Sequence, residues 1–148
     1  MSDHTFKIQA ESESHARTRV TARNFTIIVD EPPELGGTDA GPNPVEYVLA
    51  ALAGCINVTA YIVAKELKIS LQGLSIEIEG DLNPAKLLNC PTEDRAGYKS
   101  IQAIVQAKTD ADADTLAQWR SEIEKRCPVS DNLGNNTPID VKVVAANG

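Results

Sequence analysis

The sequence predicts an α+β fold with mostly antiparallel sheet, and three observations carry that prediction. Segments of alternating polar and apolar residues, typical of strands, occur before residue 30 and again in the second half of the chain. A run of 18 residues, 47–64, contains no charged side chain and lies in a helix-like context. The resulting order is strands, long helix, strands, helix and strand, which is typical of the α+β class rather than of a regularly alternating parallel sheet.

The first predicted elements are two or three strands at the N-terminus. Residues 5–11 and 15–30 alternate loosely and contain β-branched and aromatic residues at the apolar positions. Residues 30–42 then concentrate glycine and proline, including the pairs Pro32-Pro33 and Gly36-Gly37. This composition predicts a loop.

The chargeless run belongs to a predicted helix that starts at Asn43-Pro44 and ends near Lys68. Asparagine can accept amide hydrogens of the first turn, and proline at the first helical position lacks one that would be free anyway. A helix of about 25 residues is roughly 37 Å long, whereas a compact chain of this size has a radius of gyration of about 15 Å. The helix is apolar nearly all round until Lys65. Because such a helix must be covered on every side, we predict an obligate homodimer whose subunits wrap shared central helices.

Two more strands are predicted around an irregular segment. Residues 74–79 and 98–109 alternate between apolar and polar side chains, as half-exposed strands do. Residues 80–97 between them mix proline, asparagine, aspartate and glycine, which predicts a loop with one helical turn at 84–89.

The last predicted elements are a helix and a strand. Asp112 or Asp114 caps a helix that runs to about Arg126, with basic residues favouring its C-terminus. Residues 138–145 are predicted to form a final strand. With 148 residues and no linker-like seam, residues 1–148 are expected to form a single domain.

Composition narrows the expected location and partners. The chain carries 14 basic and 21 acidic residues, a net charge of -7, which disfavours binding to nucleic acid or to an anionic membrane surface. The start of the chain lacks the pattern of a signal peptide, so we expect a cytoplasmic location and reduced thiols. The chargeless run is long enough to span a membrane, but it is only mildly apolar and includes Asn57 and Thr59. We therefore expect no membrane association.

The sequence also offers few ligands for metals or cofactors. It contains no C-x-x-C or H-x-x-x-H motif, and its two histidines, His4 and His15, lie in or near the N-terminal segment. Its glycines do not match a phosphate-binding fingerprint. We expect no metal and no cofactor, and no hydrolase site built on an ordered histidine.

Three cysteines remain as candidates for chemistry. Cys55 lies near the middle of the long helix, where it is either a small buried apolar residue or a reactive thiol whose pKa an arginine from elsewhere must lower. Cys127 lies where the second helix meets Pro128 and is either a helix-end contact or a thiol favoured as thiolate by the adjacent Arg126. Cys90, in a loop, has no evident partner and is expected to be incidental.

Three segments resemble the osmotically inducible protein C family, which includes the organic hydroperoxide resistance proteins. They are residues 30–38 (DEPPELGGT), residues 41–55 (GPNPVEYVLAALAGC) and residues 127–133 (CPVSDNL). The two cysteine motifs, whose cysteines lie 72 residues apart, are together quite specific. The resemblance covers essentially the whole chain.

The resemblance implies an intertwined homodimer in which antiparallel sheets wrap around long central helices. It also implies a thiol-dependent peroxidase for organic hydroperoxides that serves oxidative stress defence. Cys55 matches the peroxidatic position and Cys127 the resolving position. An external thiol would then reduce the disulfide between them.

The family further implies an arginine that binds the thiolate and a glutamate that orients this arginine. We expect these to be Arg23 and Glu46. If no bulge interrupts the strand, alternation would place Arg17, Arg19 and Arg23 on one face. On an ideal helix the nine-residue offset puts Glu46 on the opposite face from Cys55, so a helix break or a partner subunit would have to bring it to the site.

Two other functions remain open from the sequence. The chain could form a non-catalytic dimer of the same fold that binds a small apolar ligand. Thiol–disulfide exchange on protein substrates is a weaker alternative, because enzymes of that kind normally use C-x-x-C. Geometry bears on the peroxidase hypothesis: rigidly held Cys55 and Cys127 sulfurs more than about 10 Å apart would be hard to reconcile with a two-cysteine cycle.

Overall fold

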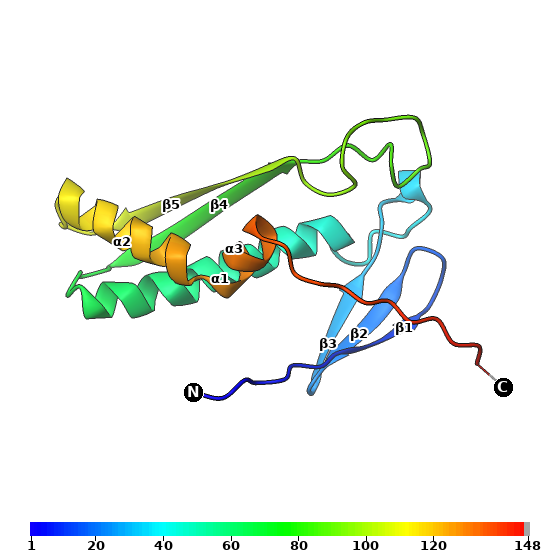
Figure 1. The fold of residues 1–148 in the computed structure, drawn as a ribbon, viewed down its shortest axis with the longest axis horizontal. Coiled ribbons are helices and arrows are strands. Elements are labelled where there is room, and N and C mark those ends of the chain that lie inside the picture. The colour runs from blue at the N-terminus through cyan, green and yellow to red at the C-terminus, as the bar shows by residue number, and fades with distance from the viewer. Residues whose placement is uncertain (147–148) are drawn as a thin grey trace. The chain divides into compact units, whose positions relative to one another are not determined.

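The computed structural model describes residues 1–146 and divides the chain into two compact units. The first unit is Met1–Ala50 and the second is Ala51–Gly148. The architecture is α+β with antiparallel sheets and one long helix, as the sequence predicts (Figure 1).

The first unit contains a three-stranded antiparallel sheet. Strands β1 (Gln9–Ser12), β2 (Thr18–Ala22) and β3 (Phe25–Val29) pair in sequence order. The two or three N-terminal strands predicted from alternation are thus confirmed. A two-residue turn joins β2 to β3, since Ala22 lies opposite Phe25 in the register.

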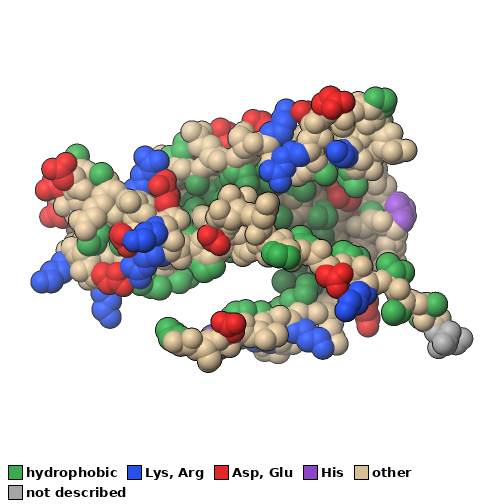
Figure 2. All heavy atoms as spheres, in the orientation of Figure 1, with side chains coloured by type: hydrophobic (Ala, Val, Ile, Leu, Met, Phe, Trp, Pro, Cys, Tyr) green, Lys and Arg blue, Asp and Glu red, His purple; other side chains and the backbone are tan. Residues whose placement is uncertain are grey.

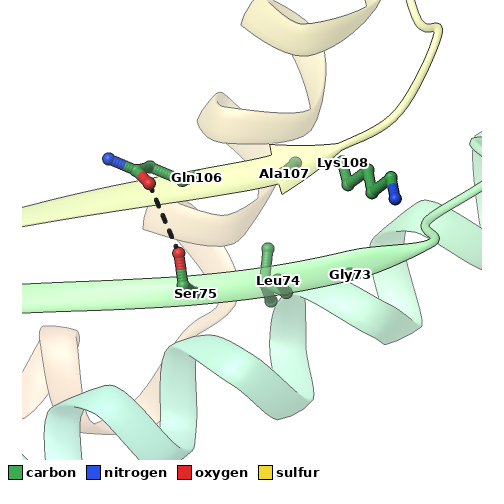
Figure 3. Close-up of a pocket in the computed structure, with 6 residues that line it drawn as sticks. All are labelled: Gly73, Leu74, Ser75, Gln106, Ala107 and Lys108. Atoms are coloured by element: carbon green, nitrogen blue, oxygen red, sulfur yellow. Dashed lines mark hydrogen bonds between the residues drawn. The ribbon is translucent and has the colours of Figure 1, made fainter.

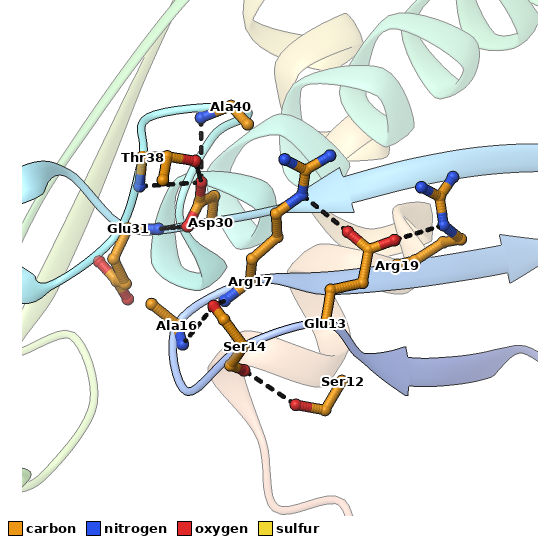
Figure 4. Close-up of polar contacts among 10 residues, drawn as sticks. All are labelled: Ser12, Glu13, Ser14, Ala16, Arg17, Arg19, Asp30, Glu31, Thr38 and Ala40. Carbon is orange, nitrogen blue, oxygen red and sulfur yellow. Dashed lines mark hydrogen bonds and ion pairs between the residues drawn. The ribbon is translucent and has the colours of Figure 1, made fainter.

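The loop after β3 is organised around one buried carboxylate, that of Asp30, which is 0% exposed (Figure 4). It accepts hydrogen bonds from the amides of Glu31, Thr38 and Ala40 at 2.8–3.1 Å and from the Thr38 hydroxyl at 2.7 Å. These donors, the Thr38 hydroxyl first, lower the pKa of Asp30 to about 2. A charged group can be buried here because neighbouring donors replace its water.

One glycine in this loop, Gly37, allows two stretches of backbone to lie very close together. A Cβ atom at Gly37 would overlap the carbonyl of Glu31, so no other residue fits without moving the backbone. The loop also contains the short 3₁₀ helix η1 (Pro33–Leu35). The glycine- and proline-rich segment is therefore a defined turn structure rather than a flexible connection.

Helix α1 (Pro44–Glu66) follows without a break. Its first turn is a capping box: the amide of Asn43 donates to the Glu46 carboxylate at 2.8 Å, and the amide of Glu46 donates to the Asn43 side chain at 2.9 Å. The helix ends where Lys68 adopts a left-handed conformation with φ 58°. Both ends lie within two residues of the predicted ones.

The second unit combines a hairpin with α1 from Ala51 onward and two further helices. Strands β4 (Gly73–Asp81) and β5 (Ser100–Lys108) pair antiparallel over nine residues each, and α2 (Ala113–Arg126) follows. The N-cap of α2 is Asp112, one of the two predicted caps, which accepts from the amide of Thr115 at 2.8 Å. The loop between the strands contains the predicted helical turn at 84–89, closed by a bond from the Leu88 amide to the Pro84 carbonyl.

The core of the second unit lies between α1 and α2. Trp119 is 4% exposed, and its indole nitrogen donates to the carbonyl of Ala60 at 2.8 Å. The buried core residues are Leu52, Ile56, Ala60, Val63, Ala64, Trp119, Ile123 and Cys127, with apolar side chains of β4 and β5 packed against them. The single tryptophan thus fixes one helix against the other through both packing and a hydrogen bond.

Two features of the C-terminal segment differ from the sequence-based expectation. A helix not predicted, α3 (Pro128–Gly134), starts directly after Cys127 with proline at its first position. The strand predicted at residues 138–145 is wrong for the described chain: these residues form no strand, and Ile139, Val141 and Val143 are 78–92% exposed. Alternation supplies only one face of a strand, whereas a strand also needs an edge with which to pair.

Helix α1 is also long and apolar enough, by length and composition, to cross a membrane. A third of its most apolar 18-residue window (33%) is buried inside the structure. Core helices of water-soluble proteins pass the same test, so the property is weak evidence for a membrane span.

Candidate active site

The structure brings Cys55 and Cys127 together. Cys55 lies in the middle of α1, and Cys127 lies at the joint between α2 and α3, where Pro128 prevents α2 from continuing. The two Sγ atoms are 2.9 Å apart and hydrogen-bonded, and both thiols are free. This separation is far inside the distance at which a two-cysteine cycle would be hard to reconcile with the structure.

The two cysteines differ in how far they are exposed. Cys127 is 1% exposed, whereas Cys55 is half-buried and lines a cavity of about 470 Å³. The other residues that line this cavity are Gly54, Val58, Thr59, Ile62, Arg126 and Pro128. Nothing lies within 4 Å of where a Cβ of Gly54 would stand, so that position leaves the approach open. A small molecule in the cavity therefore meets the Cys55 sulfur, while the Cys127 sulfur lies behind it.

Burial and hydrogen bonds shift the two thiols in opposite directions. The pKa of Cys55 is raised by burial and by the neighbouring Cys127 sulfur, against the Val129 amide, which donates to the Cys55 Sγ at 3.5 Å. The pKa of Cys127 is lowered: burial acts to raise it, but hydrogen bonds from Cys55, Ser130 and Val129 outweigh this effect. Opposite shifts are expected for two acids that share one site and lose their protons one after the other.

One arginine reaches the wall of the cavity, and it is held by carboxylates. Arg126 makes a two-pronged contact with Glu66 at the end of α1, at 2.5 and 3.0 Å, and its Nη1 lies 3.9 Å from Glu122. The Arg126 guanidinium lowers the pKa of Glu66. Arg126 was expected from the sequence to favour a thiolate at Cys127, but the structure directs its guanidinium at Glu66, a residue that sequence reasoning did not single out.

Arg23, the arginine expected to activate the thiolate, lies in the turn between β2 and β3. Its φ is 56°, and its guanidinium lies 4.9 Å from the centre of the Phe25 ring. The expectation that Arg17, Arg19 and Arg23 share one strand face is therefore wrong, because Arg23 lies outside β2, in a left-handed turn to which strand alternation does not apply.

The other two N-terminal arginines share one partner. Arg17 and Arg19 both bind the carboxylate of Glu13, at 2.8 and 2.6 Å (Figure 4). Within the first unit they therefore stabilise the connection from β1 to β2.

Glu46, the glutamate expected to orient the arginine, is occupied in the capping box of α1. Because α1 is unbroken, the offset along the helix leaves Glu46 and Cys55 on opposite faces. The first unit contains no ion pair between Arg23 and Glu46 in its described residues. The structure thus brings the two predicted cysteines together but does not join the predicted arginine to the predicted glutamate.

A second hollow, of about 390 Å³, lies over the ends of β4 and β5 (Figure 3). Ser75 donates to Gln106 across the strands at 3.5 Å, and Lys108 is the only ionisable residue among those lining it. Within residues 1–146, no group of three or more His, Cys, Asp or Glu side chains is placed to hold a metal ion. The cysteine pair is therefore the strongest candidate for chemistry in the described chain.

Known proteins resemble this chain over most of its length. Residues 37–142 match the family model described as OsmC-like protein. Over 149 aligned residues the chain is 26% identical to a protein of Bacillus subtilis described as the uncharacterized protein YmaD, with 96% of this chain and 95% of that protein covered.

Solved structures show the same fold. An OsmC-like protein from Mycoplasma pneumoniae superimposes with a TM-score of 0.77 at 21% identity, covering 90% of this chain and 89% of the other. An organic hydroperoxide resistance protein OsmC from Legionella pneumophila gives a TM-score of 0.64 at 22% identity, with 90% and 91% covered. An organic hydroperoxide resistance protein from Elizabethkingia anophelis gives 0.65 at 17%, with 91% of each chain covered. By the extent of the sequence match and by its fold, this chain belongs to the OsmC-like family.

Proposed function

We propose that this protein is a thiol-dependent peroxidase that reduces organic hydroperoxides, with Cys55 as the peroxidatic and Cys127 as the resolving cysteine. The observation that carries the proposal is the pair of free sulfurs 2.9 Å apart, of which only Cys55 lines a cavity. The similar proteins from Legionella and Elizabethkingia, both described as organic hydroperoxide resistance proteins, support it.

The proposed cycle balances with the two cysteines and one external dithiol. The Cys55 thiolate attacks the outer oxygen of the hydroperoxide, the O–O bond breaks, and an alkoxide leaves and takes a proton to become the alcohol. Cys55 is now a sulfenic acid. The Cys127 sulfur attacks it, a disulfide forms and hydroxide leaves as water. Two electrons from an external dithiol then restore both thiols.

Organic rather than hydrogen peroxide is the proposed substrate because of the cavity wall. Val58, Ile62 and Pro128 supply apolar surface beside Cys55. An alkyl or aryl group buried against them gains roughly 25 cal/mol per Å² of apolar area, which hydrogen peroxide cannot gain.

The same surface supports the homodimer. Val58, Tyr61 and Ile62 on α1 are 46–59% exposed, an unusual property for the apolar face of a central helix. Figure 2 shows apolar side chains open to solvent along this part of the molecule. We propose that a second copy of the chain covers α1, that the dimer works in the cytoplasm, and that it needs neither membrane nor nucleic acid.

The proposal is tested by following cumene hydroperoxide in the presence of dithiothreitol. Wild type should consume it catalytically, Cys55→Ser should show no consumption above buffer, and Cys127→Ser should complete one turnover and then slow. Cys90→Ser is the matched control, because Cys90 is exposed and outside the pair. Mass spectrometry after one equivalent of oxidant should find a Cys55–Cys127 disulfide. Equal rates in wild type and Cys55→Ser would refute the proposal.

A second candidate function is a non-catalytic dimer that binds a small apolar molecule beside Cys55. It is favoured by one observation: among the described residues of the second unit, the arginine at the cavity is bound to Glu66. Such a protein would bind an unreactive analogue such as cumyl alcohol, with the same affinity in wild type and Cys55→Ser, and would leave the hydroperoxide unconsumed.

A further inference from the structure

A buried hydroxyl lines the same cavity as the Cys55 sulfur. Thr59 is 7% exposed and, with Asp30, is one of two buried polar side chains among the described residues. It lies beside Cys55 in a cavity wall that also contains the apolar residues Val58 and Ile62. A hydroxyl in apolar surroundings is costly unless it is hydrogen-bonded, so the partners of this one are informative.

The Thr59 hydroxyl has one hydrogen to donate, and it donates to an acceptor that does not depend on it. Thr59 Oγ1 donates to the carbonyl of Cys55 at 2.9 Å. In an α-helix such a carbonyl already accepts from the backbone amide four residues later. The hydroxyl hydrogen can therefore turn about the Cβ–Oγ1 bond towards another acceptor without leaving a buried carbonyl unpaired.

Thr59 is also close enough to act on the sulfur and on what reacts with it. It follows Cys55 by four residues in the unbroken helix α1, so the two side chains are neighbours on one face. Side chains on a helix lean towards its N-terminus, which directs Thr59 towards Cys55. Burial, first of all, raises the pKa of Cys55, whereas a hydrogen bond with the Thr59 side chain acts to lower it.

The other donors around the cavity are engaged. Both terminal nitrogens of Arg126 bind the Glu66 carboxylate. The Val129 amide donates to the Cys55 sulfur itself, at 3.5 Å. Among the described residues that line the cavity, Thr59 is therefore the donor that can bind an incoming oxygen without breaking an ion pair.

We propose that Thr59 is a further catalytic residue: its hydroxyl donates a hydrogen bond to the inner oxygen of the hydroperoxide while Cys55 attacks the outer one. A hydroperoxide that extends from Cys55 along α1 brings its inner oxygen towards Thr59. The inference rests on the proposed function, since it concerns the first step of that reaction.

The role of the hydroxyl follows from where the charge goes in this step. A bond forms between the Cys55 sulfur and the outer oxygen, the O–O bond breaks, and its electron pair leaves with the inner oxygen as an alkoxide. A donor aimed at that oxygen stabilises the negative charge as it develops in the transition state. The hydroxyl keeps its own proton, and water protonates the alkoxide to give the alcohol and hydroxide.

The test compares two reagents that are attacked by the same sulfur. Cleavage of cumene hydroperoxide, followed in a single turnover without reductant, expels an oxygen, whereas alkylation of Cys55 by iodoacetamide expels iodide. Both rates are measured in the Cys90→Ser protein at a pH where neither rises further, so that ionisation of Cys55 is complete. Thr59→Val removes the hydroxyl at nearly constant volume. It should slow the hydroperoxide reaction by about 100-fold and leave alkylation unchanged.

Further variants separate the hydroxyl from the packing of the side chain. Thr59→Ser keeps the hydroxyl and should stay close to wild type, while Thr59→Ala should behave as Thr59→Val does. This pair isolates the hydroxyl even where valine disturbs folding. Thr26→Val, at an exposed position of β3 that does not line the cavity, is the control and should match wild type.

The outcomes distinguish this inference from the peroxidase itself. Equal slowing of both reagents in Thr59→Val, or equal hydroperoxide rates in Thr59→Ser and Thr59→Ala, would overturn the inference and leave the peroxidase standing. A wild-type protein that is alkylated at Cys55 but consumes no hydroperoxide would refute the peroxidase, and the inference with it.

Discussion

Two acidic side chains, Asp30 in the first unit and Cys55 in the second, have pKa values shifted in opposite directions. Asp30 in the first unit is fully buried and accepts four hydrogen bonds, and its pKa falls to about 2. Cys55 in the second unit is half-buried among apolar residues, and burial first of all raises its pKa, although the Val129 amide donates to its sulfur at 3.5 Å. The number and strength of donors, rather than burial alone, decide which acid stays ionised.

The two environments have different physical consequences. A carboxylate that is saturated with donors is inert and ties a loop together. A sulfur with few donors, next to a second sulfur and an open cavity, keeps its lone pairs available for chemistry. The first unit thus depends on polar contacts at Asp30, whereas the second depends on apolar packing around Trp119.

The largest expected change in stability comes from removing the apolar packing around Trp119 in the second unit. Trp119→Ala removes a buried ring and the hydrogen bond to Ala60, which should cost about 3–5 kcal/mol of unfolding free energy. Urea titration followed by circular dichroism measures it. Trp119→Phe keeps most of the volume and should cost clearly less; equal losses would mean that packing is not what stabilises this unit.

The next largest change in stability is expected from removing the charge of Asp30 in the first unit. Asp30→Asn removes the charge and presents an amide NH₂ to groups that are themselves donors, so Tm should fall by roughly 5–10 °C at fixed protein concentration. Asp39→Asn is the matched control, since Asp39 is exposed and its φ of 55° suits asparagine. A Tm of Asp30→Asn equal to that of the control would show that the four hydrogen bonds are not needed.

The contribution of the Asp30 carboxylate to stability should also be measurable in the wild-type protein, by lowering the pH. The pKa of Asp30 is about 2 in the folded chain and ordinarily 3.8, so the unfolded chain takes up the proton first as pH falls. The stabilisation is complete above pH 3.8 and is lost as pH falls towards 2. Thermal melts between pH 5 and pH 2 should therefore show a steeper fall for wild type than for Asp30→Asn, and parallel curves would contradict this.

The smallest expected effect concerns the ion pair at the cavity wall. Glu66→Gln removes the partner of Arg126, but both side chains are well exposed, at 53% and 35%. Water compensates for such a loss, so Tm should change by about 1–2 °C. A much larger fall, in thermal melts of Glu66→Gln beside Glu124→Gln as a surface control, would mean that Glu66 positions the α2–α3 joint.

Much of the chain was predictable because its signals are local. The N-cap residue Asn43, the N-cap residue Asp112 and the alternation in β4 and β5 each act within a few residues, and the structure contains all three features. The role of Glu46 in capping the long helix was not predicted. The two cysteine motifs pointed to Cys55 and Cys127 before any geometry was known.

Other features depended on contacts far apart in the sequence. The predicted strand at 138–145 had the right alternation but pairs with no other strand among the described residues. The helix at 128–134 was missed because Pro128 can start a helix as readily as end one. The turn position of Arg23 depends on the register of β2 with β3, which sequence alternation does not determine.

By itself the sequence determined the class of fold and the ends of its long helix, because propensity, capping and periodicity are local properties. The resemblance of two motifs to a known family singled out Cys55 and Cys127 as candidates for chemistry. Only the tertiary structure decided that their sulfurs lie 2.9 Å apart, that Cys55 faces a cavity while Cys127 is buried, and that Arg126 binds Glu66. Those contacts join residues 60 to 72 positions apart, and their geometry follows from how the helices pack rather than from any one segment.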